Sequence, residues 1–368
     1  MTAAALRVWL LPSAFAPHKG GVEELTLQLA RQLIARDHEV TVVTNRWPQD
    51  LPVVDDIDGI PVRRIRFTLP ARRPRSIAEH AWGSRAATRE LLSLPEPDVV
   101  HVQCASSQLA FATRYAVDKH VPLIVSTQGE TAMDAQNIYG RNPWLRRQLR
   151  VASHAASALT ACSEWTRNHA CSVAPAFQRA SIVLNGVSPE DWPETPVPSA
   201  PIIAAWGRHV PQKGFDLLVA AFRLVRAGNP QAQLLLGGSG PETEHLRQLA
   251  GPGVTFLGPL DRRGVRSLLE RSRIAVVPSR IEPFGIVALE ALASGRGLVY
   301  SPHGGLSEAT GGLGRAADPF RCHELAEAVL SELEDPTDGA EGRKRAQELR
   351  WEAIADQYEA IYRAQTQA

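Results

Sequence analysis

The chain has 368 residues, of which 44% are hydrophobic and 21% are charged. This length suits two domains of ordinary size, and the composition excludes a disordered or fibrous protein. Forty basic residues against thirty-nine acidic ones create no overall attraction to nucleic acid, which is therefore not an expected partner.

Short β-branched runs alternate with amphipathic helical stretches in the first half of the chain. Two helices are expected, at residues 23–37 and 145–157. The expected strands are residues 6–11, 38–44, 98–103, 121–127 and 158–163. Alternation of this kind predicts a parallel sheet covered by helices on both faces.

Residues 186–201 hold five prolines and little apolar periodicity, which is typical of a linker. After it the alternation resumes. The expected strands are 201–207, 232–238, 254–258, 274–279 and 297–301, and the expected helices are 216–227, 262–272 and one from about 286.

We therefore predict an α/β protein with two doubly wound parallel sheets. The first domain spans 1–185, the linker 186–201, and the second domain 202–350. Residues 351–368 form an amphipathic helix. Ligands of such sheets bind beyond the carboxyl ends of the strands, so the site is expected in a cleft between the domains.

The cysteines and the lack of a long apolar run bear on the compartment. The cysteines are Cys104, Cys162, Cys171 and Cys322. None forms a C-x-x-C pair or has a histidine at metal-ligand spacing, so we expect reduced thiols. The apolar run at 8–11 is too short for a signal peptide, and no run approaches the ~18 residues of a membrane span. We expect a soluble, cytoplasmic protein. Any membrane contact would involve only the protein surface, at the inner face of the membrane.

The strongest local signal is the stretch from Ser279 to Glu290. A buried strand ends in a loop with Glu282, and Gly285 then starts a helix. The free N–H groups of such a helix start suit a diphosphate. Glu290, further along, would accept hydrogen bonds from a ribose, and Glu282 from sugar hydroxyls. Two solvated helix-end glutamates are the alternative.

A second signal is G-R-H-V-P-Q-K-G, which follows the strand at 201–207. Arg208 and Lys213 can converge on one diphosphate, the leaving group in transfer from a nucleotide sugar. A solvated basic loop is the alternative.

A third, weaker signal is the pair Gly20 and Gly21 at a strand-to-helix turn, where the backbone can approach a phosphate or sugar. Asp56 and Asp58 form an Asp-x-Asp, which could hold a metal-bound nucleotide. Since Gly59 follows, we interpret the pair as a turn between two strands and expect no metal site. The glycines at 237–240 do not complete a dinucleotide-binding fingerprint.

Together these motifs resemble the GT-B retaining glycosyltransferases of family four along nearly the whole chain. The most specific stretches are the adjacent "E-P-F-G-I-V-A-L-E" and "S-G-R-G-L-V-Y-S-P-H-G-G-L-S-E". The stretches "P-H-K-G-G-V-E", "D-V-V-H-V-Q", "L-N-G-V" and "G-R-H-V-P-Q-K-G" also match.

The resemblance implies a metal-independent hexosyltransferase without a cofactor, which moves a sugar from a nucleoside-diphosphate sugar to a hydroxyl acceptor. Arg208 and Lys213 would hold the diphosphate, Glu290 the ribose and Glu282 the donor sugar. The implied remaining donor contacts are Gly20, Gly21, Phe284, Gly285 and Ile286. By the same resemblance, residues 1–185 would be the acceptor-side domain and residues 202–350 the nucleotide-sugar-binding domain. The final helix, 351–368, would cross back to the first domain.

One position departs from the family pattern. Gln128 stands where the family usually has a histidine near the donor sugar and acceptor. Glutamine forms hydrogen bonds but cannot titrate. His101, at the end of a neighbouring strand, is a second acceptor-side candidate, with a buried structural role as the alternative.

Arginines crowd two stretches of the first domain, at 63–75 and 141–150, with Trp144 and Leu145 among them. They could meet an anionic membrane or a lipid-linked acceptor, bind a phosphorylated acceptor, or be solvated. Two other functions are compatible with the motifs. One is a nucleotide-sugar 2-epimerase of the same fold, and the other is a catalytically silent sugar-nucleotide-binding subunit.

Overall fold

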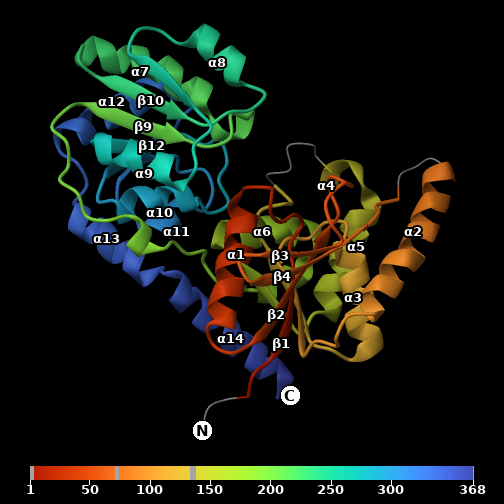
Figure 1. The fold of residues 1–368 in the computed structure, drawn as a ribbon. Coiled ribbons are helices and arrows are strands. Elements are labelled where there is room, and N and C mark those ends of the chain that lie inside the picture. Colours follow the sequence, from red (N-terminus) through yellow and green to blue (C-terminus); the bar gives the residue numbers. More distant parts are fainter. Residues whose placement is uncertain (1–3, 71–73, 133–137, 368) are drawn as a thin grey trace. The chain divides into compact units, whose positions relative to one another are not determined.

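The computed structural model describes residues 4–70, 74–132 and 138–367, with the side chains of 74–82 and 138 left out. The chain divides into two compact units (Figure 1). The first comprises Met1–Val183 with Trp351–Ala368, and the second comprises Leu184–Arg350. The segment expected to be a linker, 186–201, belongs to the second unit.

The first unit is built on a sheet with the strand order β3-β4-β2-β1-β5-β6-β7-β8. The strands are β1 (Arg7–Leu11), β2 (Glu39–Asn45), β3 (Val54–Ile57), β4 (Ile60–Ile65), β5 (Val99–Val102), β6 (Leu123–Thr127), β7 (Ala158–Ala161) and β8 (Ser181–Ile182). All neighbours pair in parallel except β3, which is antiparallel to β4. Strands β5 and β6 are buried along their whole length, as strands covered on both faces must be.

Helices cover both faces of this sheet in Figure 1. They are α1 (Gly21–Ile34), α2 (Pro74–Leu92), α3 (Leu109–Lys119), α4 (Ile138–Arg141), α5 (Pro143–Ala155), α6 (Glu164–Val173) and α14 (Trp351–Thr366). The core between helices and sheet includes Trp9, whose ring centroid lies 4.7 Å from that of Tyr115.

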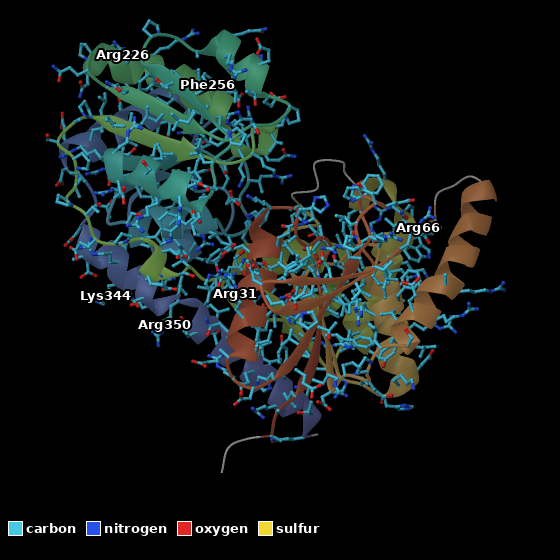
Figure 2. All side chains as sticks on the ribbon, in the orientation of Figure 1. Arg31, Arg66, Arg226, Phe256, Lys344 and Arg350 are labelled. Atoms are coloured by element: carbon cyan, nitrogen blue, oxygen red, sulfur yellow. The ribbon has the colours of Figure 1, made fainter. Side chains whose placement is uncertain are left out.

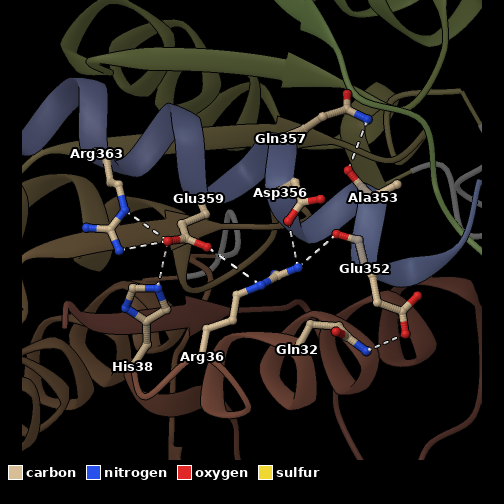
Figure 3. Close-up of polar contacts among 9 residues, drawn as sticks. All are labelled: Gln32, Arg36, His38, Glu352, Ala353, Asp356, Gln357, Glu359 and Arg363. Atoms are coloured by element: carbon tan, nitrogen blue, oxygen red, sulfur yellow. Dashed lines mark hydrogen bonds and ion pairs between the residues drawn. The ribbon is translucent and has the colours of Figure 1, made fainter. Parts of the chain in front are cut away.

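Helix α14 packs within the first unit through a buried face that includes Ile354 and Tyr358. Polar and charged side chains add to this packing (Figure 3). Glu359 lies 2.7 Å from Arg363 on its own helix and 3.4 Å from His38. Arg36, just after α1, reaches Asp356 at 2.7 Å and Glu359 at 3.7 Å. Since Arg36 and Glu359 are mostly shielded from solvent, this network fixes the helix more firmly than surface pairs would.

The second unit is a parallel sheet with the order β11-β10-β9-β12-β13-β14. Its strands are β9 (Ile202–Trp206), β10 (Gln233–Gly237), β11 (Val254–Gly258), β12 (Ile274–Val277), β13 (Gly297–Tyr300) and β14 (Arg315–Ala316). Its helices are α7 (Phe215–Gly228), α8 (Thr243–Leu249), α9 (Arg262–Arg271), α10 (Ile286–Ala293), α11 (Leu306–Thr310), α12 (Cys322–Glu334) and α13 (Gly339–Glu348). The predicted pair of parallel-sheet α/β domains is confirmed.

The Asp-x-Asp lies in a hairpin, as predicted. Strands β3 and β4 pair through a turn at Asp58 and Gly59, whose φ angles of 53° and 82° are those that a tight hairpin turn requires. Behind it, Arg64 is 1% exposed and its Nη1 donates to Asp55 at 2.6 Å. The prediction that Arg64 belongs to an exposed basic cluster is therefore wrong.

Two absences hold for the residues that the structure describes. In that part of the chain, no three His, Cys, Asp or Glu side chains gather in a way that could hold a metal ion. No helix there is both long and apolar enough to cross a membrane.

Candidate functional site

The loop between β9 and α7 carries two predicted site residues, Arg208 and Lys213. Residues 211–213 form a single 3-10 turn, and Gly214, with a φ of 66°, is the N-cap residue of α7. A Cβ at Gly214 would collide with the carbonyl oxygen of Pro278, which follows β12. The loop after β9 therefore packs directly on the loop after β12, at the carboxyl ends of neighbouring strands.

The structure brings Lys213 and Glu282 together. The Lys213 ammonium lies 2.6 Å from Oε2 of Glu282, and the Ser279 hydroxyl donates to the same oxygen at 3.0 Å. Glu282 is 6% exposed, so the pair is largely desolvated. Removal of one partner would leave the other charge buried without compensation.

The backbone of Glu282 is fixed from the other side by the loop after β13. The Glu282 amide donates to the His303 carbonyl at 3.1 Å, and the Gly305 amide donates to the Glu282 carbonyl at 2.8 Å. Gly304, between them, has a φ of 119°, and a Cβ there would collide with that carbonyl. Glu282 is thus held between the loops that follow β12 and β13.

Helix α10 begins directly after this loop. Phe284 is buried, and Gly285, with a φ of 93°, leads into the first helical residue, Ile286. The N–H groups at a helix start point outward without intrahelical partners, as an anion site requires. Since Phe284, Gly285 and Ile286 come just after Glu282, they lie beside the Lys213–Glu282 pair, as the motif predicted. Their contact with a donor remains a prediction.

Glu290 is half-buried further along α10. Its Oε2 accepts a hydrogen bond of 3.1 Å from the indole N–H of Trp206, the last residue of β9. The indole orients the carboxylate, and no sequence signal pointed to Trp206 as its partner. Whether Glu290 then binds a ribose remains a prediction.

Arg208 is exposed, whereas its neighbour His209 is buried. The ring of His209 contacts the Thr243 hydroxyl at 2.9 Å, and burial lowers the pKa of this histidine. Among the residues that the structure describes, none pairs with the Arg208 guanidinium. The loop thus carries two cations. Lys213 is paired with the carboxylate of Glu282, whereas Arg208 faces solvent.

Gly20 and Gly21 lie at the exposed start of α1 in the first unit. Gly20 has an extended backbone, with a φ of 179°. A Cβ at Gly20 would lie 2.6 Å from Oε2 of Glu23, so a carboxylate already stands at this helix start. A phosphate that approached Gly20 from this side would meet the Glu23 carboxylate.

Gln128 and His101 lie at neighbouring strands of the first unit, Gln128 after β6 and His101 within β5, but they differ in how far they are buried. Gln128 is half-buried, directly after β6. His101 is 0% exposed, and its Nδ1 and Nε2 lie 2.6 Å from the Tyr362 hydroxyl and 2.7 Å from the Ser126 hydroxyl. Burial lowers the pKa of His101 to about 3. This geometry supports the structural alternative for His101 rather than an acceptor-side role.

Glu130 is a residue whose role the sequence analysis missed. Its carboxylate accepts hydrogen bonds from the Ala105 amide at 3.0 Å, the Gln128 amide at 2.7 Å and the Thr127 hydroxyl at 3.3 Å. It therefore joins the loops that follow β5 and β6. Burial raises the pKa of Glu130, and the backbone donors oppose that rise. A carboxylate three residues beyond the end of a buried parallel strand, β6, was the available signal.

Two family models match the chain. The model described as Glycosyltransferase Family 4 matches residues 19–191, and the one described as Glycosyl transferases group 1 matches residues 200–335. The alpha-maltose-1-phosphate synthase of Mycolicibacterium smegmatis is 31% identical over 281 residues, which cover 63% of this chain and 72% of that protein. The phosphatidyl-myo-inositol mannosyltransferase of Propionibacterium freudenreichii is 28% identical, with 97% of this chain and 94% of that protein covered.

A solved structure, that of Anabaena HepE in complex with UDP-glucose, matches with a TM-score of 0.76 at 18% identity. The match covers 98% of this chain and 100% of that chain. The fold, with its two parallel-sheet units, is that of the GT-B glycosyltransferases. The chain belongs to glycosyltransferase family 4, as the motifs indicated.

Proposed function

We propose that this glycosyltransferase moves a hexosyl sugar from a nucleoside-diphosphate sugar to a hydroxyl acceptor, with retention of anomeric configuration and without a metal. The acceptor is a glycan, a lipid-linked molecule or a small natural product. The HepE structure, solved with UDP-glucose, supports a nucleotide-sugar donor. The names of the relatives, an alpha-maltose-1-phosphate synthase and a mannosyltransferase, support a hexosyl group.

The observation that carries the proposal is the Lys213–Glu282 pair at 2.6 Å, beside the start of α10. A diphosphate at that helix start would draw on the helix N–H groups, Lys213 and the exposed Arg208. Cations at this position stabilise the charge that develops as the diphosphate leaves. Glu282 would then be free to accept hydrogen bonds from the donor sugar. The leaving phosphate itself can take the acceptor proton, so the proposal needs no side-chain base.

Replacement of Glu282 by alanine tests this assignment. Glu282→Ala should abolish sugar transfer but leave most of the nucleoside-diphosphate affinity, because Lys213 keeps its charge. Glu244→Ala is the matched control, since this glutamate of the same unit has a side chain that is 72% exposed. Loss of nucleotide binding in Glu282→Ala together with loss of transfer would contradict the assignment of Glu282 to the sugar.

The two other candidate functions separate in the same assays. A 2-epimerase would convert the donor sugar in the absence of any acceptor, and it needs titratable groups beside the sugar. The non-titrating Gln128 does not favour it. A silent binding subunit would bind the nucleotide and turn over no donor.

A membrane surface is the partner that we propose for the lipid-linked case. Arg141, Arg147 and Arg150, on α4 and α5, are exposed, and so is Arg66, labelled in Figure 2. Arg72, Arg73 and Arg75 lie outside the described side chains. Exposed arginines attract anionic headgroups by about 1 kcal/mol each.

Sedimentation with vesicles tests this contact. The protein should sediment with anionic vesicles at low salt and be released at high salt. The variant Arg147→Glu/Arg150→Glu should sediment less. Sedimentation that is equal for anionic and neutral vesicles would contradict the proposal.

A further inference from the structure

Arg280, two residues before Glu282, forms a two-pronged ion pair with Asp216 at the start of α7. Its Nη1 lies 2.7 Å from Oδ1 of Asp216, and its Nη2 lies 2.6 Å from Oδ2. Both side chains are 28% exposed. The hydrogen bond from Arg280 lowers the pKa of Asp216, as a close charge-assisted pair should. Parallel hydrogen bonds of this kind fix direction as well as distance.

The same arginine also holds the turn that carries Lys213. Its Nη1 donates to the Pro211 carbonyl at 2.7 Å, and its backbone amide donates to the Gln212 carbonyl at 2.9 Å. With Asp216, these contacts secure the chain on both sides of Lys213. The turn therefore cannot shift without breaking several hydrogen bonds to one residue.

Arg280 lies in the loop after β12, and only Ile281 separates it from Glu282. One residue thus connects the two loops whose side chains, Lys213 and Glu282, meet at 2.6 Å. The Arg280 guanidinium carbon lies 5.9 Å from the ring centroid of Phe320, which supports the guanidinium on a further side.

We propose that Arg280 and Asp216 are positioning residues that set the place of Lys213 relative to Glu282 and the start of α10. Neither is proposed to touch the substrate. Their effect on donor binding rests on the proposed function, in which Lys213 binds the diphosphate. Displacement of a catalytic cation by about 1 Å can lower a rate about a hundredfold.

A purely structural role is the competing interpretation, and the chain offers a matched control for it. Arg315 pairs with the buried Glu332 at 2.9 Å in the same unit. It lies on β14, and its partner lies on α12. Arg315→Ala should lower the melting temperature as Arg280→Ala does, but no contact connects Arg315 to the turn at 211–213 among those of the described residues.

The first experiment needs no ligand. The chain is treated with an amine-reactive acetylating reagent, and the modification of each lysine is followed by mass spectrometry. Lys213, whose side chain is 19% exposed, should react slowly in the unaltered protein. The other lysines, Lys19, Lys119 and Lys344, are exposed and serve as internal references (Lys344 is labelled in Figure 2).

Arg280→Ala should make Lys213 react several times faster, with the reference lysines unchanged. Arg280→Lys, which keeps the charge but not the fork, should lie between the two. Arg315→Ala should leave Lys213 protected. Equal reactivity of Lys213 in Arg280→Ala and Arg315→Ala would overturn the inference.

The second experiment measures donor binding and transfer. Arg280→Ala should weaken nucleoside-diphosphate affinity about tenfold and lower kcat up to about a hundredfold, whereas Arg315→Ala should change neither. Faster labelling of Lys213 with unchanged affinity and kcat would also overturn the inference. If the unaltered protein binds no nucleoside diphosphate, the proposed function fails, and the labelling result still decides whether Arg280 positions Lys213.

Discussion

His101 makes the stability of the first unit depend on pH, and this dependence can be measured. Its ring is fully buried between the hydroxyls of Tyr362 and Ser126, and burial lowers its pKa to about 3. In the unfolded chain the pKa of this histidine returns to about 6.5. At a pH between these two pKa values, His101 binds a proton in the unfolded chain but not in the folded protein.

The free energy of unfolding should therefore fall as the pH is lowered through about 6.5. Proton linkage at this one site predicts a loss of about 2 kcal/mol between about pH 7.5 and about pH 5. The size of the loss over this range depends on the unfolded pKa, because the folded pKa lies far below it.

Urea unfolding of His101→Gln and the unaltered protein, compared at each pH, measures this contribution. The glutamine keeps hydrogen-bonding atoms but cannot titrate, so the difference between the two stabilities should shrink by about 2 kcal/mol over that range. The control is His120→Asn, since His120 is exposed and has a φ of 57°, which asparagine tolerates. A difference that does not change with pH would refute the linkage argument. A loss of kcat without loss of stability in His101→Gln would restore the acceptor-side role.

Three further substitutions test the packing of the site. Gly214→Ala should lower the free energy of unfolding by about 3 kcal/mol or more, because the new Cβ would collide with a backbone carbonyl oxygen. Gly312→Ala, at a φ of 82° with open space around it, should lower it by about 1 kcal/mol. Equal losses in urea unfolding would contradict the close approach at Gly214. Trp206→Phe removes the hydrogen bond that orients Glu290. Calorimetry should then show weaker binding of a nucleoside diphosphate and unchanged binding of pyrophosphate. Equal weakening of both would exclude a contact between Glu290 and the ribose. Glu130→Gln places an amide N–H₂ against backbone donors and so should disturb the loop that carries the acceptor-side candidate Gln128; steady-state kinetics should show a transfer rate about tenfold lower with unchanged nucleotide affinity. An unchanged rate would show that the bond from Glu130 to Gln128 does not matter for transfer.

Local sequence patterns were sufficient for much of the fold. The expected strand at 254–258 coincides with β11, and the expected helix at 216–227 differs from α7 by one residue at each end. Each of these elements has a clear apolar pattern bounded by polar residues or glycine. Helix α13 was not predicted, because two glycines, Gly339 and Gly342, and several charged residues obscure the periodicity of Gly339–Glu348.

Contacts between distant residues set the limit of prediction for the site. The motifs indicated Lys213 and Glu282 separately, but their ion pair joins residues 69 positions apart. The bond from Trp206 to Glu290 spans 84 positions. Arg64 was misjudged although its partner is only nine positions away, because an arginine in a basic run looks solvated until the β3–β4 hairpin places Asp55 beside it. Composition and periodicity carry no information on such pairings.

The central claim is that the second unit binds a nucleoside diphosphate through Arg208, Lys213 and the start of α10. The most direct measurement is the thermal stability of the protein with UDP, GDP, ADP and dTDP in turn, in the presence of a metal chelator. A ligand at a hundred times its dissociation constant should stabilise the protein by about 2.7 kcal/mol. We predict such a shift with one of the four, and its loss in the double variant Arg208→Ala/Lys213→Ala. No shift with any of them, at concentrations up to the millimolar range, would contradict the claim.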